Sequence, residues 1–70
     1  MAEIRAEMVA NIFELQVGEG DRVEAGGILL LLESMKMEIP VLTEDAGTVT
    51  RVAVSEGDVV QEGDLLAVVE

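Results

Sequence analysis

The chain has 70 residues, a mass of 7.5 kDa and a formal net charge of −11, with 50% hydrophobic but only 1% aromatic residues. A chain of this length forms one small domain. Its hydrophobic content is too high for a disordered protein, and it predicts a core of Val, Leu, Ile and Ala with Phe13. The acidity excludes nucleic acid and anionic membranes as partners, and the lack of cysteine and histidine excludes disulfides and the commonest general base.

The segment before residue 18 is compatible with two structures. Ile4, Met8 and Ile12 follow the 3.6-residue period of an amphipathic helix. From Phe13 to Val17, however, apolar and polar residues alternate, which is typical of a half-buried strand. An internal repeat, described below, favours strand for the whole segment.

The rest of the chain is predicted to form short strands separated by turns. Turns are expected at 18–21 and 24–27, and strands over 22–23, 28–33, 38–42, 47–54, 59–60 and 65–70. Pro40 indicates an edge position for its strand, because proline cannot donate a ladder hydrogen bond.

The repeat relates the two halves of the chain at an offset of 37, from Gly20 to Gly57. The pattern Val-x-Glu-Gly-Asp-x-Val-x-x-Gly occurs over 17–26 and again over 54–63. Glu-Gly-Asp after a β-rich run favours a turn, because glycine accepts positive φ and aspartate bonds its own backbone. The segment 47–52 contains a glycine and β-rich residues, so it is a poor helix, and its counterpart in the first half should also be strand.

These patterns predict an all-β fold. We expect a flattened antiparallel β-barrel or sandwich of two four-stranded sheets with an internal pseudo-two-fold repeat. The single domain would span 1–70, with half-repeats of about 1–35 and 38–70. The approximate two-fold axis would place the central hairpin at one end of the molecule, and Met1 with Glu70 near the other.

Lys36 is the only lysine of the chain and lies at its midpoint, between Met35 and Met37. Because apolar runs flank this polar interruption, it is the predicted tip of a hairpin. Most lysines near turns serve solubility and most methionines fill cores, but a chain that used lysine for solubility would hold more than one. A lysine amine, unlike an arginine, can lose its proton and be acylated. We therefore interpret Lys36 as an amine presented for modification, with the two methionines sharing the opposite face of the strand pair as recognition groups.

The motifs resemble those of the biotinyl/lipoyl attachment domains, and closely those of the biotinyl branch, the biotin carboxyl carrier domains. That branch centres on Glu-Ala-Met-Lys-Met, where this chain has Glu33-Ser34-Met35-Lys36-Met37, and the resemblance covers both Glu-Gly-Asp segments, Gly47-Thr48-Val49 and Leu65-Leu66. It implies a barrel-sandwich hybrid with Lys36 on a protruding turn. It also implies that a biotin protein ligase attaches biotin to Lys36, and that the neighbours Glu33, Ser34, Met35 and Met37 serve in ligase recognition.

The resemblance further implies a carrier without catalytic residues of its own, which takes carboxybiotin from a biotin carboxylase site to a carboxyltransferase site. Ser34 stands where the branch usually has alanine. The repeat holds register through 18–27, which leaves no room for the extra thumb loop of some members, so a thumbless monomeric domain is expected. No signal peptide or membrane-spanning run is visible, which predicts a cytoplasmic location without membrane contact.

Two other interpretations remain open. A lipoyl carrier, with lipoate on the same lysine, would share the fold, although lipoyl sites more often resemble Asp-Lys-Ala. An unmodified structural or adaptor barrel is a different class, but it leaves the single central lysine unexplained. An enzyme is disfavoured, because Ser34 and Ser55 have no histidine partner and a barrel filled by its own core offers no evident pocket.

Overall fold

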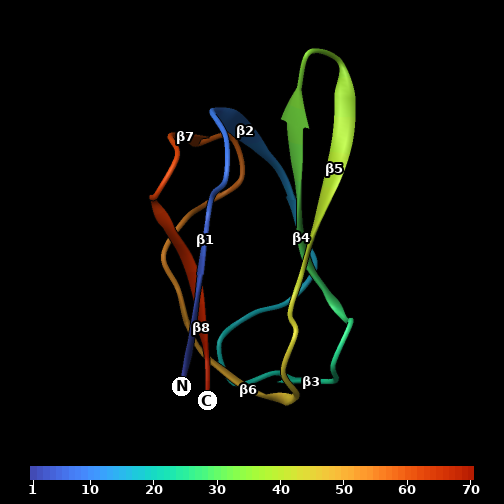
Figure 1. Ribbon diagram of the computed structural model, residues 1–70, viewed down its shortest axis with the longest axis vertical. Coiled ribbons are helices and arrows are strands. Elements are labelled where there is room, and N and C mark those ends of the chain that lie inside the picture. The colour runs from blue at the N-terminus through green and yellow to red at the C-terminus, as the bar shows by residue number, and fades with distance from the viewer.

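The computed structural model describes residues 1–70 and contains eight β-strands and no helix (Figure 1). The strands are β1 (Ala2–Arg5), β2 (Ala10–Leu15), β3 (Arg22–Val23), β4 (Ile28–Ser34), β5 (Met37–Leu42), β6 (Gly47–Val52), β7 (Val59–Val60) and β8 (Leu65–Val69). They form two four-stranded antiparallel sheets, with the strand orders β1-β8-β6-β3 and β5-β4-β2-β7. The predicted all-β fold of two such sheets is confirmed. The first segment contains the strands β1 and β2 and no helix, but it is not strand throughout, because residues 6–9 lie outside both strands. β2 also begins and ends earlier than the alternation indicated.

The core lies between the two sheets and is almost entirely aliphatic. Its largest fully buried apolar side chains are Ile12, Leu29, Leu30, Val49 and Leu66, which come from β2, β4, β6 and β8. These four strands are the inner ones of the two sheets, so they carry the β-branched and γ-branched side chains that fill the space between the sheets.

The expectation that Phe13 belongs to the core is wrong, because its side chain is 45% exposed. Ile12 takes the inward position in β2, so Phe13 faces outward. The pairing of β2 with β4 then shifts register between Ile12 and Glu14. This bulge changes the phase of the alternation, so that Leu15 packs against the core.

The offset of 37 found in the sequence also relates the hydrogen bonds that join the two halves. Gly20 N donates to Val49 O at 2.7 Å, and Gly57 N donates to Ile12 O at 2.8 Å. Both glycines have positive φ, 94° and 93° respectively. Each half therefore places a left-handed turn against the inner strand of the other half.

The glutamate before each of these glycines makes an equivalent cross-connection. Glu19 Oε2 accepts a hydrogen bond from Val52 N at 3.1 Å, and Glu56 Oε2 accepts one from Leu15 N at 3.0 Å. Every sheet contains strands from both halves of the chain. The Glu-Gly-Asp motif of each half thus connects its turn by hydrogen bonds to a strand of the other half.

The β4–β5 hairpin extends from one end of the molecule, and both termini lie at the opposite end (Figure 1). β1 pairs with β8, with Ala2 opposite Val69. This is the predicted placement of the hairpin and the chain ends. β5 is an edge strand, as Pro40 indicated. The structure holds no helix of the length and apolar character needed to cross a membrane.

Candidate modification site

The site is a tight turn that joins β4 to β5. Ser34 pairs with Met37, which leaves Met35 and Lys36 as the two central residues, with φ of 53° and 65°. Positive φ at both central residues is characteristic of the type I′ turn, whose twist matches that of the flanking strands. Glycine or asparagine usually occupies such positions, whereas here two long side chains do.

The two methionines do not share a strand face, contrary to expectation. Met35 is a turn residue, while Met37 is the first residue of β5. A two-residue turn leaves only one of them in a strand, so the alternation rule does not apply to the pair. Both side chains are nevertheless exposed, at 90% for Met35 and 60% for Met37. Apolar groups therefore flank Lys36 at the surface.

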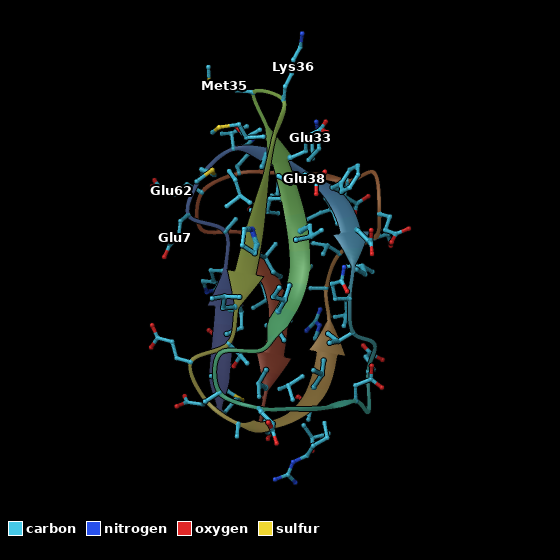
Figure 2. The ribbon with its side chains drawn as sticks, turned by 90° about the vertical axis from the view of Figure 1, so that its right-hand side faces the viewer. Glu7, Glu33, Met35, Lys36, Glu38 and Glu62 are labelled. Carbon is cyan, nitrogen blue, oxygen red and sulfur yellow. The ribbon has the colours of Figure 1, made fainter.

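Lys36 is exposed and points away from the body of the domain at its tip (Figure 2). Its ammonium group has no hydrogen bond or ion pair to the rest of the chain; the single ion pair of the protein joins Arg5 to Glu3. No side chain of the domain bonds to Nζ and could take its proton. The amine is thus accessible to the active site of another protein.

Two carboxylates lie directly below the turn. Glu33 and Glu38 face each other across β4 and β5 (Figure 2). Like charges at opposed positions repel and destabilise a strand pair by a small amount. Glu33 and Ser34 are half-buried, whereas Glu38 is exposed. The five residues predicted to form the site lie together around this one turn. They combine an amine, two exposed thioethers, a hydroxyl and a carboxylate, and they are Glu33, Ser34, Met35, Lys36 and Met37.

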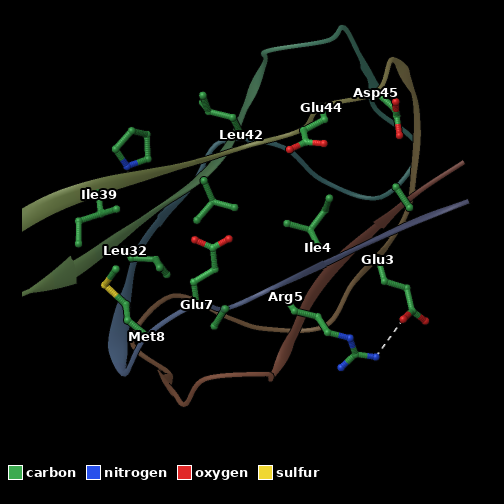
Figure 3. A pocket seen from close by; sticks show the side chains of 14 residues that line it. Glu3, Ile4, Arg5, Glu7, Met8, Leu32, Ile39, Leu42, Glu44 and Asp45 are labelled. Carbon is green, nitrogen blue, oxygen red and sulfur yellow. Dashed lines mark hydrogen bonds and ion pairs between the residues drawn. The ribbon is translucent and has the colours of Figure 1, made fainter.

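The structure also contains a groove that the sequence did not indicate. It opens along one side of the domain, between the edge strands β1 and β5, and has a volume of about 380 Å³ (Figure 3). The expectation of no evident pocket is therefore wrong. A groove of this kind depends on the gap between two sheet edges, and Pro40, as an edge marker, was its only sequence signal. No group of three or more potential metal ligands is present anywhere in the protein.

Comparison with known proteins identifies relatives that match nearly the whole chain. A family model described as "Biotin-requiring enzyme" matches residues 2–69. The chain is 60% identical over 70 residues to the biotinylated protein TB7.3 homolog of Mycobacterium leprae (strain TN), a match that covers 99% of either chain. It is 43% identical over 63 residues to the biotin/lipoyl attachment protein of Bacillus subtilis (strain 168), covering 90% of this chain and 86% of that protein.

A solved structure shows the same fold inside a much longer chain. The crystal structure of the Kluyveromyces lactis urea carboxylase superposes with a TM-score of 0.92 and 32% sequence identity. The match covers 99% of this chain but 6% of that one. A domain of this architecture is thus a small part of a large carboxylase there.

Proposed function

Because the chain belongs to the family of biotin/lipoyl attachment domains, we propose that it is a biotin carrier and that Lys36 is the residue which bears the biotin. The observation that carries this proposal is the state of Lys36: the only lysine is exposed, unpaired and central in a tight turn at one end of the molecule. Biotin supplies carboxyl-transfer chemistry when bound, so the partners are the biotin carboxylase and carboxyltransferase components of a biotin-dependent carboxylase. The lipoyl alternative has less support, since the relative matched at 60% identity is named as biotinylated.

The chain's part in the modification is to present Nζ. An amide bond forms between Nζ and the carboxyl carbon of biotinyl-adenylate, the bond from that carbon to the phosphate oxygen breaks, and AMP leaves. The ammonium group loses two protons in total, one before the attack and one as the amide forms, and both pass to the ligase and its solvent. Attack requires the neutral amine, and no side chain of the domain bonds to Nζ to act as the base. A biotin protein ligase therefore supplies both the activated acyl group and the deprotonation.

The residues around Lys36 serve as the recognition sequence of that ligase. Met35 and Met37 offer adaptable apolar contacts on either side of the amine. Ser34 and Glu33 lie on β4 and fix the point at which the turn leaves the strand. Since the strand pairing orders the turn before binding, the ligase spends little free energy on ordering its substrate.

The attached group does the chemistry, and the domain contributes a tether and a docking surface. A tether raises the local concentration of the carried group at each partner site without a need for tight binding. The domain has no histidine and no nucleophile–base pair, so we expect it to have no catalytic activity of its own.

Intact-mass measurement tests this function. The protein is incubated with biotin, ATP and a purified biotin protein ligase, or with lipoate, ATP and a lipoate ligase. We expect one biotin increment on the native protein and none on Lys36→Arg, with unchanged far-UV circular dichroism. The matched control is the double variant K36R/R51K, which moves the single lysine to an exposed position of β6 and should stay unmodified. Biotin on K36R, or a native protein that accepts only lipoate, would contradict the proposal.

A further inference from the structure

The groove between β1 and β5 has two unpaired sheet edges as its walls. β1 and β5 are the terminal strands of their sheets, so one edge of each strand lacks a neighbouring strand. Unpaired N–H and C=O groups along an edge are a ready template for another extended chain. Pro40 removes one donor from β5, whereas β1 contains no proline and keeps its backbone donors. β1 is therefore the better template of the two.

The floor of this groove is apolar. Leu32 is buried, at 3% exposure, while Ile4, Ile39 and Val41 are half-buried and pack against the core. The partial exposure of three branched aliphatic side chains along one groove leaves apolar surface that a bound segment would cover.

Two carboxylates above this floor have no partners. The side chains of Glu7 and Glu44 project into the opening (Figure 3), and neither makes a hydrogen bond or an ion pair. The only basic residue of the lining, Arg5, is already held by Glu3 Oε1 at 3.0 Å and by Gly63 O at 2.9 Å. Glu7 and Glu44 are related by the offset of 37, so the negative charge comes from both halves of the chain.

We propose that this groove binds an extended basic segment of a partner protein, which pairs as an added strand along the edge of β1. The unpaired carboxylates select lysine or arginine in the bound segment by charge complementarity. Long basic side chains suit the site, because their methylene stems cover apolar surface while their charged ends reach the carboxylates. Pairing of the backbone with a sheet edge supplies affinity, and the charges supply specificity.

This binding surface is separate from the modification site. The groove is formed along the side of the domain, whereas Lys36 lies at the tip of the hairpin (Figure 2). A partner that holds the domain by this groove leaves the carried group free to move. The inference goes beyond the biotin carrier function, because it requires no modification of Lys36.

The test uses the ¹⁵N-labelled, unmodified, full-length protein and the peptide acetyl-Lys-Val-Lys-Val-Lys-Val-amide. In a titration followed by NMR, we expect amide shift changes concentrated in residues 2–8 and 37–45. Glu7→Gln and Glu44→Gln should each weaken binding by about threefold or more, because each removes one charge pairing. The matched control Glu14→Gln removes the same charge from an exposed position of β2 outside the groove, and it should bind as the native protein does.

Two outcomes would overturn the proposal. The first is that Glu14→Gln weakens peptide binding as much as Glu7→Gln and Glu44→Gln do, or that the shift changes spread over the whole surface. Either result would mean that the peptide binds through the net charge of the protein and not through the groove. Equal binding of the same peptide with all six residue nitrogens methylated, which leaves those residues no backbone N–H to donate along either edge, would refute the pairing with β1. Because neither measurement involves a ligase, the result is independent of whether Lys36 carries biotin.

Discussion

Met35 and Lys36 occupy a backbone conformation that side chains with a β-carbon disfavour. Their φ values of 53° and 65° lie in the left-handed region, which costs an L-residue roughly 1–2 kcal/mol. Backbone strain of this kind persists where the surrounding structure holds the strained residues in place, and here the pairing of β4 with β5 does so. A glycine or asparagine would form the same turn more easily. The chain accepts this cost at the turn where its only lysine lies.

Replacement of Met35 by asparagine should stabilise the fold and impair modification. Asparagine tolerates the left-handed region, and Met35 loses little burial because its side chain is 90% exposed. We expect the free energy of unfolding to rise by about 0.5–1 kcal/mol, or the Tm by about 2–8 °C, while the rate of biotinylation falls. Thermal unfolding and intact mass measure the two effects.

Met37→Asn is the control for this turn prediction, because it removes the other exposed methionine at a position without positive φ. It should impair modification without raising the Tm. A Tm gain of the same size in both variants would contradict the strain argument.

At the scale of single elements, the turns hold the sheets in register. Gly57 precedes β7, has φ of 93°, and donates its N–H to Ile12 O in β2. Open space surrounds the position where a β-carbon would stand, so crowding is not the reason for glycine there. Backbone conformation is the reason, because a branched residue is strongly disfavoured at this φ.

Gly57→Val should therefore damage folding rather than recognition. We expect a loss of about 2 kcal/mol, which lowers the Tm of a domain of this size by roughly 8–16 °C. Gly18→Val is the matched control, since Gly18 also has open space but lacks positive φ. Its effect on the Tm should be much smaller. Equal losses in the two variants would show that turn conformation is not the cause.

At the scale of the whole molecule, the chain ends lie at the opposite end from the proposed modification site. The Cα trace extends over 31 × 17 × 17 Å, and the termini lie at the end opposite to the hairpin (Figure 1). A polypeptide joined to either terminus is thus far from Lys36.

A globular domain fused to Glu70 through a flexible linker should leave the rate of biotinylation within about twofold of the native rate, because terminal extensions at a distant surface are well tolerated. The rate is measured by intact mass over time, with the K36R form of the same fusion as the unlabelled control. A tenfold loss of rate in the folded fusion would place the linker end close to the modification site and contradict the arrangement.

Much of this architecture follows from local sequence chemistry. Glu19-Gly20-Asp21 and its copy at 56–58 specify turns, and two copies in register imply two equivalent sets of strands. The position of Phe13 could not be predicted, because the bulge after Ile12 depends on pairing with β4, which local alternation does not contain. The orientations of Met35 and Met37 depended on the turn being two residues long. The groove depends on the separation of β1 and β5, two strands that are distant in sequence.

The internal dyad has a consequence for stoichiometry. A dyad ordinarily provides every feature in duplicate, yet the hairpin with the only lysine occurs once. This hairpin connects the two halves, since it joins β4 of the first half to β5 of the second, and two halves of one chain share a single such connection. The dyad therefore does not duplicate Lys36, and we expect one prosthetic group per domain.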